Sequence, residues 1–183
     1  MLRDAFLSRL RSSGRPTVSV EFFPPKKPEE AAAMLDTARA LQPLGIDFAS
    51  FTYGAGGSDR STVLEYGSKL VQAGFPLIAH LTCVGHSRAE LADIIAKYDD
   101  AGFAGILALR GDPPGGVGTR FTPHPDGYRN AADLVRGIKE LGDFDVSVSA
   151  YPERHPESVS IEEDLAFMAD KAEHGASRAI SQF

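Results

Sequence analysis

Residues 77–110 read LIAHLTCVGHSRAELADIIAKYDDAGFAGILALR, and this stretch holds the pattern that decides the fold. Its two apolar runs, Leu77–Cys83 and Gly105–Arg110, are typical of buried β-strands. Between them, Ser87–Glu90 has the S-x-x-E spacing of a capping box, which predicts the start of a helix. Gly102 suits the left-handed residue that ends a helix. The stretch therefore predicts a strand–helix–strand unit of about thirty residues with parallel strands.

The same unit recurs along the chain. The apolar runs that predict strands are Thr17–Phe23, Asp47–Tyr53, Leu77–Cys83, Gly105–Arg110, Asp145–Tyr151 and Arg178–Phe183. Helical stretches alternate with them, and the glycines expected to end these helices in a left-handed conformation are Gly45, Gly74, Gly102, Gly142 and Gly175. Helix starts are also indicated at Pro28–Glu30 and Ser160–Glu163, and a short amphipathic helix is expected at Leu2–Leu10.

Two architectures fit repeated strand–helix units, a (β/α)8 TIM barrel and a doubly wound open sheet. A barrel typically takes ~250 residues. This chain has 183 residues, and no helix follows its last apolar run, Arg178–Phe183. A complete open sheet is expected to end in a covered strand, so the barrel is the favoured interpretation. We expect one domain over residues 1–183 that contains about six of the eight βα units of a barrel.

The composition narrows the class of protein. Hydrophobic residues make up 43% of the chain and charged residues 24%, which is typical of a globular protein. The 19 basic and 25 acidic residues give a net charge of −6, so neither nucleic acid nor an anionic membrane is an expected partner. The single cysteine, Cys83, excludes an internal disulfide and is expected in the core. The charged N-terminal residues 1–11 lack the apolar stretch of a signal peptide, and no segment reaches the ~20 apolar residues of a membrane span. Together with the lone cysteine, this predicts a cytoplasmic protein.

Polar residues gather at the carboxyl ends of the apolar runs. They are Glu21, Thr52, Tyr53, His80, Thr82, Arg110, Asp112, Tyr151, Glu153 and Gln182. In either architecture these ends converge on the face where parallel α/β proteins place their active sites. The apolar neighbours of Glu21 in the sequence favour a raised pKa and a role as general acid. The alternative is a structural glutamate paired with Lys26 or Arg110.

Several other groups have both a functional and a structural interpretation. Arg110–Asp112 offers a cation and a carboxylate to a ligand, or forms an internal ion pair. His80 is a hydrogen-bonded core residue or a catalyst, and Gly54–Ser58 is a phosphate loop of unusual pattern or a turn. Asp164 and Lys171 share a helix face that is expected to be solvated. The five histidines lack the spacing of zinc ligands, so no metal site is expected.

Six motifs resemble those of the methylenetetrahydrofolate reductase family, and they occur in family order from about Val18 to the last residue. They are Val20–Pro25 (VEFFPP), Thr52–Ala55 (TYGA), His80–Cys83 (HLTC), Ala108–Pro113 (ALRGDP), Tyr151–Glu157 (YPERHPE) and Ile180–Phe183 (ISQF). The resemblance implies an FAD-containing (β/α)8 barrel, an oxidoreductase that acts on CH–NH donors. It implies reduction of 5,10-methylenetetrahydrofolate to 5-methyltetrahydrofolate by NADH or NADPH, in one-carbon metabolism and methionine synthesis. Homo-oligomers are common in the family.

The resemblance also implies roles for individual residues. Glu21 is the general acid that assists opening of the five-membered ring of the folate, Asp112 contacts the folate and tunes the flavin, and Gln182 faces folate and nicotinamide. The implied FAD contacts are Thr52, Tyr53, Ala55, His80, Arg110, Gly111, Asp112, Tyr128, Tyr151, His155, Asp164 and Lys171. His80, Asp164 and Lys171 thereby change from structural to cofactor-binding residues. Two positions depart from the family: Ser181 replaces a threonine, and Phe167 occupies an often polar position near the nucleotide half of FAD.

Other interpretations remain open at the level of sequence. One is an inactive fragment that binds flavin or folate without turnover. A second is an open-sheet α/β binding protein, which would have no affinity for flavin. A third is a metal-dependent barrel aldolase or hydrolase, which bound metal would reveal. An unclosed barrel is expected to expose strand edges and apolar helix faces.

Overall fold

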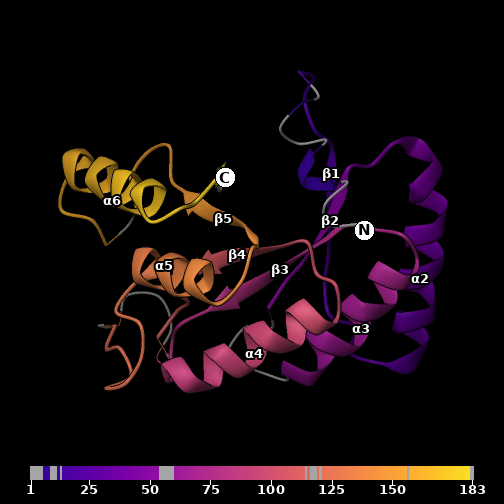
Figure 1. The fold of residues 1–183 in the computed structure, drawn as a ribbon, viewed down its shortest axis with the longest axis horizontal. Helices are drawn as coiled ribbons and strands as arrows, with labels where there is room; N and C mark the ends of the chain where they lie inside the picture. Colours follow the sequence, from indigo (N-terminus) through magenta and orange to yellow (C-terminus); the bar gives the residue numbers. More distant parts are fainter. Residues whose placement is uncertain are drawn as a thin grey trace. The chain divides into compact units, whose positions relative to one another are not determined.

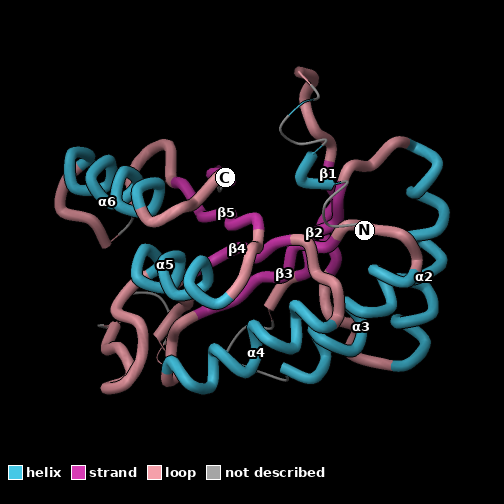
Figure 2. Tube along the Cα trace, in the orientation of Figure 1, coloured by secondary structure: helices cyan, strands magenta, loops and turns pink. Residues whose placement is uncertain are grey.

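The structure is a computed structural model that describes residues 6–8, 12, 14–53, 60–113, 115, 119, 121–155 and 157–181. Within these ranges strands and helices alternate along the chain (Figure 1; Figure 2). The strands are β1 (Ser19–Phe22), β2 (Phe48–Phe51), β3 (Leu77–Thr82), β4 (Gly105–Leu109), β5 (Asp145–Ala150) and β6 (Arg178–Ser181). The helices are α2 (Pro28–Leu41), α3 (Arg60–Gln72), α4 (Arg88–Asp100), α5 (Ala131–Leu141) and α6 (Ile161–Glu173), with a 3-10 helix, η1 (Gln42–Leu44), after α2.

Every predicted apolar run contains one of these strands, so the predicted order of strands is confirmed. The strands are shorter than the runs, although amides beyond the strand ends still bond to a neighbouring strand, as Asp47 does to the oxygen of Val18 at 2.8 Å. The expected helix at Leu2–Leu10 lies largely outside the described residues, and the loop Gly54–Ser58 lies wholly outside them.

The strands form a sheet in which neighbours follow chain order, β1-β2-β3-β4-β5-β6. The pairings of β1 with β2, of β2 with β3 and of β5 with β6 are parallel. A doubly wound sheet reverses its strand order at a switch point, whereas a (β/α)8 barrel adds each new strand on the same side. The fold is therefore a TIM-like α/β fold, which confirms the predicted fold class.

Two compact units make up the chain. They are Met1–His80 with Lys97–Ile106, and Leu81–Ala96 with Leu107–Phe183. In the first unit, helix α3 lies close to its neighbours because Gly67 has no side chain. A Cβ atom at this position would lie 2.7 Å from the ring of Phe103 and 2.8 Å from Cδ2 of Leu77. The arrangement of residues 1–183 as one domain stays a prediction.

The core of the second unit includes one face of α5. Its apolar side chains recur at helical spacing and are buried, and β5 contributes buried valines beside them. These residues are Leu134, Val135, Ile138, Val146 and Val148. The apolar residues recur about every 3.6 residues in α5 and every second residue in β5, so each element turns one apolar face toward this core.

The predicted capping boxes form at the helix starts. In α4, the amide of Glu90 donates to Oγ of Ser87 at 3.3 Å, and the amide of Ser87 donates to Oε2 of Glu90 at 2.9 Å. At α6, Oγ of Ser160 accepts from the amide of Glu163 at 3.2 Å. The carboxylate of Glu163 reaches back one residue further, to the amide of Val159 at 2.9 Å. Both boxes satisfy amides that the helix itself leaves without partners.

The C-cap predictions hold at four glycines and fail at one. Gly45, Gly74, Gly102 and Gly175 have φ angles of 76°, 94°, 75° and 109°. Gly142 instead has a φ of −174°, so the prediction of a left-handed cap there is wrong. The chain leaves α5 in an extended conformation. A Cβ atom on Gly142 would lie 2.9 Å from the ring of Phe144, so close packing of this buried ring accounts for the glycine.

Replacing Ser160 with alanine is expected to lower the free energy of unfolding by about 1 kcal/mol, because the Glu163 amide loses its acceptor. Urea unfolding at pH 7 measures the change. Ser160→Asp keeps an acceptor at the N-cap and should stay within about 0.5 kcal/mol of the wild type. An alanine variant as stable as the wild type would contradict the stabilising role of this cap.

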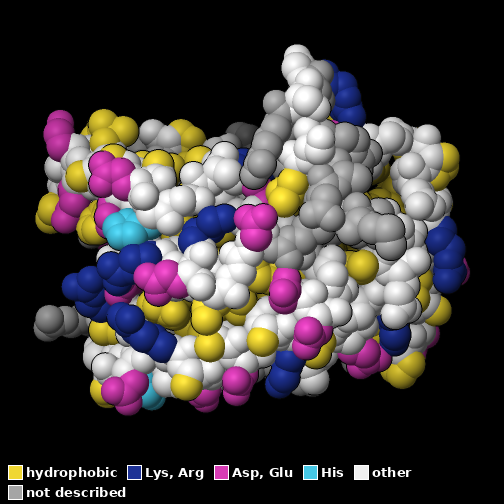
Figure 3. Space-filling view, viewed as in Figure 1, with side chains coloured by type: hydrophobic (Ala, Val, Ile, Leu, Met, Phe, Trp, Pro, Cys, Tyr) yellow, Lys and Arg dark blue, Asp and Glu magenta, His cyan; other side chains and the backbone are white. Residues whose placement is uncertain are grey.

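Helix α6 exposes apolar side chains to solvent, and Figure 3 shows hydrophobic side chains at the surface over this helix. Ile161, Leu165 and Phe167 of α6, and Val159 just before it, are all exposed. Ile161 and Leu165, four residues apart, lie on one face of the helix and form a small apolar surface there. Among the described residues, no helix is both long enough and apolar enough to cross a membrane.

Candidate active site

Glu21 lies near the carboxyl end of β1, beside polar side chains of the next two strands. Strand pairing sets Glu21 opposite Ser50 of β2, and the Ser50 hydroxyl donates a 3.1 Å hydrogen bond to Oε2 of Glu21. Nε2 of His80 in β3 lies 3.3 Å from the same oxygen. The structure thus gives Glu21 a serine and a histidine as partners in place of the predicted Lys26 or Arg110. Strand register brings these groups together, and nearness in the sequence does not show it.

The predicted rise in the pKa of Glu21 is wrong. The approach of His80 holds the pKa of Glu21 below its ordinary value, burial opposes this effect, and the Ser50 hydroxyl adds to the lowering. The apolar neighbours in the sequence do not enclose the carboxylate, because side chains alternate along a strand. Phe22 packs edge-on against Phe75, and Phe23 is exposed. The Glu21 side chain itself is 46% exposed.

His80 has a buried nitrogen whose hydrogen bonding is incomplete. Its side chain is only 11% exposed, and Nε2 has no well-aligned hydrogen-bond partner in the described part of the chain. The 3.3 Å approach to Glu21 is an ion-pair distance without hydrogen-bond alignment. Buried polar atoms in folded proteins almost always have partners. This nitrogen is therefore suited to bind a ligand group.

In the second unit, Arg110 follows β4 and forms a two-pronged ion pair with Glu157. Its Nη1 and Nη2 lie 2.5 and 3.0 Å from the two carboxylate oxygens, and its guanidinium lies 4.8 Å from the ring centre of Phe121. The arginine holds the pKa of Glu157 below its usual value. Gly111 adopts a φ of 82°, and a Cβ there would lie 2.6 Å from Cγ1 of Val84. The backbone beside Arg110 therefore accepts no side chain.

The loop after β5 is fixed by the first turn of α6. Asp164 accepts a 2.5 Å hydrogen bond from the amide of His155 and a short one from the hydroxyl of Ser158. Burial would raise the pKa of Asp164, but these two donors outweigh it and lower the pKa. The rings of Tyr151 and His155 meet edge to face at 4.6 Å. Arg154 between them has a φ of 120°, a strained conformation for a residue with a side chain.

Lys171 lies on α6 and is only partly exposed to solvent. Its ammonium donates to the backbone oxygen of Ser149 in β5 at 3.0 Å. Burial lowers the pKa of Lys171, and Asp164 opposes that shift. The interpretation of Asp164 and Lys171 as a solvated surface is therefore wrong. Both side chains organise the carboxyl end of β5 and the loop that follows it.

The other predicted site residues lie at or beyond the ends of these strands. Thr52 and Tyr53 are half-buried after β2, and the amide of Thr52 donates to the oxygen of Phe22 at 3.0 Å. Asp112 is exposed in the segment after β4. Tyr128 is buried, and burial raises the pKa of its phenol. Ala55 and Gln182 lie outside the described residues.

Cys83 is a core residue, as the sequence predicted. Its side chain is fully buried, and burial raises the pKa of its thiol to about 11. A thiol with so high a pKa remains protonated at neutral pH and is a poor nucleophile.

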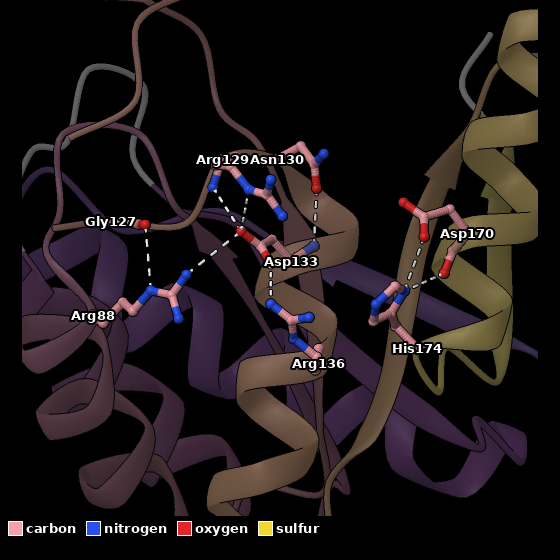
Figure 4. A network of polar contacts seen from close by, with 8 residues as sticks. All are labelled: Arg88, Gly127, Arg129, Asn130, Asp133, Arg136, Asp170 and His174. Carbon is pink, nitrogen blue, oxygen red and sulfur yellow. Dashed lines mark hydrogen bonds and ion pairs between the residues drawn. The ribbon is translucent and has the colours of Figure 1, made fainter. Parts of the chain in front are cut away.

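A polar network around Asp133 was not predicted from the sequence (Figure 4). The Asp133 side chain is 3% exposed, and its carboxylate accepts from Arg129 at 3.1 Å and from Arg136 at 2.5 Å. Arg88 approaches it to 3.7 Å, and the side chain of Asn130 accepts from the amide of Asp133. The Asn-x-x-Asp spacing at a helix start was a usable signal for the cap. Nothing in the sequence pattern showed that Arg88, from another helix, would join it.

Comparison with known proteins adds a decisive observation. A family model described as methylenetetrahydrofolate reductase matches residues 6–183. The chain belongs to the methylenetetrahydrofolate reductase family. This confirms the family that the six sequence motifs predicted.

Relatives named 5,10-methylenetetrahydrofolate reductase agree with this assignment. The protein of Pectobacterium carotovorum is 42% identical over 171 residues, which cover 93% of this chain and 55% of the relative. That of Escherichia coli K12 is 41% identical over 184 residues, which cover 99% of this chain and 60% of the relative. The chain thus spans a little over half the length of these methylenetetrahydrofolate reductases.

Solved structures of lower sequence similarity share the fold of this chain. A 2,3-dimethylmalate lyase of the PEP mutase/isocitrate lyase superfamily aligns with a TM-score of 0.71 at 12% identity, covering 100% of this chain and 62% of that one. A phosphonopyruvate hydrolase in complex with oxalate and Mg²⁺ aligns with a TM-score of 0.69 at 15% identity, covering 100% and 63%. At such identities the similarity concerns the fold alone, and it agrees with the TIM-like strand order.

Proposed function

We propose that this chain is the flavin-binding and catalytic part of an enzyme that reduces 5,10-methylenetetrahydrofolate to 5-methyltetrahydrofolate with NADH or NADPH. Family membership and the names of the relatives support this reaction. The observation that carries the proposal is the half-exposed Glu21, held by Ser50 and His80 at neighbouring parallel strands. Family membership also supports a cytoplasmic homo-oligomer that serves one-carbon metabolism and methionine synthesis.

Each unit, taken by itself, contains residues that fit groups of an FAD cofactor, whose pyrophosphate and ring atoms need hydrogen-bond donors and close backbone approach. The first unit offers the unsatisfied Nε2 of His80. The second offers the cations of Arg110 and Lys171 and the side-chain-free backbone at Gly111. We assign the FAD contacts to Thr52, Tyr53, Ala55, His80, Arg110, Gly111, Asp112, Tyr128, Tyr151, His155, Asp164 and Lys171. FAD, when bound, supplies the hydride chemistry that side chains lack.

In this proposal the residues of the chain bind, orient and protonate the folate. Glu21 in its acid form gives a proton to the folate nitrogen whose bond to the methylene carbon breaks. The electron pair of that bond stays on the protonated nitrogen, the other folate nitrogen shares its lone pair with the methylene carbon to form a C=N⁺ bond, and Glu21 is left as a carboxylate. A bound ligand that covers the exposed half of Glu21 removes water and moves its pKa upward, toward the acid form. Asp112 and Gln182 orient the folate and the nicotinamide.

The absorption spectrum of the purified protein, recorded after incubation with FAD and desalting and then after anaerobic addition of NADH or NADPH, tests the cofactor site. A retained flavin band that bleaches is the expected result. Addition of 5,10-methylenetetrahydrofolate to the reduced protein should then restore the band. Retained flavin that never bleaches would support a binding protein without turnover, and loss of all flavin on desalting would contradict the proposed site.

A further inference from the structure

Both partners of Glu21 contact the same carboxylate oxygen. The Ser50 hydroxyl and Nε2 of His80 lie 3.1 and 3.3 Å from Oε2. Oε1 has no hydrogen-bond partner among the described residues, although 46% of the Glu21 side chain is exposed. The two oxygens of one carboxyl group therefore have different surroundings: Oε2 is held by the strands, and Oε1 is left without a hydrogen-bond partner in the described part of the chain.

Ser50 is placed to hold Oε2 in a constant position. It lies within β2, directly opposite Glu21 in the parallel pairing, and is 7% exposed. Because the ladder fixes the backbone of β2, the hydroxyl oxygen of Ser50 can move only by rotation about χ1. A side chain as long as glutamate, half of it in solvent, otherwise samples several rotamers. The buried hydroxyl thus restricts where the carboxyl group can point.

We propose that Ser50 is a positioning residue that anchors Oε2 of Glu21, so that Oε1 carries the proton delivered to the folate. The inference rests on the proposed function and adds a residue that makes no assigned contact with folate or cofactor. When the proton sits on Oε1, Oε2 is a carbonyl-type oxygen that still accepts the serine hydrogen bond. After transfer, Oε2 belongs to a carboxylate and accepts the same bond.

A neutral hydroxyl suits this task better than a cation would. A lysine or arginine at this position would stabilise the carboxylate strongly and hold back the acid form that must donate the proton. The serine bond survives in both protonation states, so it fixes geometry through the whole transfer. Alignment of the reacting atoms is a large part of enzymatic rate acceleration, and small misplacements of a catalytic group are costly.

The test compares the two half-reactions of the FAD-loaded protein by anaerobic stopped-flow absorbance. In Ser50→Ala, reoxidation of the reduced protein by 5,10-methylenetetrahydrofolate should slow by about 10- to 100-fold. Flavin reduction by NADH should stay within about 2-fold of the wild type, because Glu21 takes no part in it. Ser50→Thr restores a hydroxyl on a strand-compatible side chain and should recover most of the folate rate.

Two controls separate positioning from stability. Ser147→Ala removes another buried serine hydroxyl, in β5, where it accepts from Arg178 at 3.0 Å, and it should leave the ratio of the two half-reaction rates unchanged. In a Glu21→Gln background, Ser50→Ala should cause no further loss, because the serine acts through Glu21. Thermal unfolding and flavin content of each variant establish that the fold is intact.

The outcomes distinguish this inference from the proposed function. A wild-type protein that binds FAD but is never reoxidised by the folate would overturn the proposed function and this inference with it. If the wild type turns over and folded Ser50→Ala keeps its folate rate, or loses both half-reactions equally, the positioning role alone is refuted. Failure of a folded Ser50→Thr variant to recover the folate rate would also refute it.

Discussion

Glu21→Gln is expected to abolish reoxidation of the reduced flavin by 5,10-methylenetetrahydrofolate while flavin reduction by NADH survives. Glutamine keeps the length of the side chain and an acceptor for the Ser50 hydroxyl, but its amide has no acidic proton to transfer to the folate nitrogen. Loss of a general acid typically slows a step by about 10²- to 10⁴-fold. Stopped-flow measurement of each half-reaction under anaerobic conditions gives the two rates separately.

Glu30→Gln is the matched control for this prediction. Glu30 lies in the first turn of α2, belongs to the same unit and accepts from the amide of Lys26, on the surface of the protein. Both half-reactions should keep their wild-type rates in this variant. If Glu21→Gln slowed both half-reactions equally, Glu21 would not be the proton donor.

Asp133→Asn is expected to lower the free energy of unfolding by about 2–4 kcal/mol. The carboxylate is buried and accepts hydrogen bonds from Arg129 and Arg136, with Arg88 close by (Figure 4). The amide of asparagine removes the negative charge and sets an N–H group against these donors. Urea unfolding at pH 7 measures the loss. Asp143→Asn is the control, because Asp143 is exposed and its ion pair with Lys139 is 3.7 Å long, so the change should stay within about 0.5 kcal/mol.

The difference in the free energy of unfolding between the wild type and Asp133→Asn should depend on pH. Burial raises the pKa of Asp133, but the hydrogen bonds and charge of Arg129 and Arg136 outweigh it, so the folded pKa lies below the unfolded one. The stabilisation is complete above the unfolded pKa, about 3.9, and is lost as the pH falls through the folded pKa. Unfolding curves at pH 7 and at successively lower pH should therefore converge for the two proteins. If the difference in the free energy of unfolding stayed constant as the pH was lowered, the charge of Asp133 would not be what stabilises the fold.

Local patterns predicted the fold well because each strand and helix carries its own signal. The buried runs, the S-x-x-E boxes at Ser87 and Ser160, and the left-handed glycines depend only on residues close in sequence. The left-handed C-cap predicted at Gly142 is wrong because this glycine has another use. It leaves room for the ring of Phe144, and its backbone is extended. A pattern typical of C-caps cannot distinguish these two uses of glycine.

The position of the candidate site stays a prediction, whereas its pairings were not predictable from the sequence. Polar residues at strand ends predict a site at the carboxyl ends of the strands, because every parallel strand contributes there. The partner of Glu21 depends on the register of β1 against β2, and the partner of Arg110 is Glu157, which comes from a different loop of the chain. The direction of the Glu21 pKa shift was wrong for the same reason, since it depends on His80 from β3. Pairings across strands are set by three-dimensional packing, which spacing does not encode.

The exposed apolar side chains of α6 have a practical consequence for work with this polypeptide in solution. We expect the exposed Ile161 and Leu165 to promote association through the hydrophobic effect, which strengthens on warming from low temperature. Samples should therefore be clearest in the cold and turn turbid as the temperature rises, well before the core unfolds. Salting-out agents such as sulfate should lower the temperature at which the sample becomes turbid. A dye that fluoresces on apolar surfaces should bind to the exposed side chains of α6 in the folded protein.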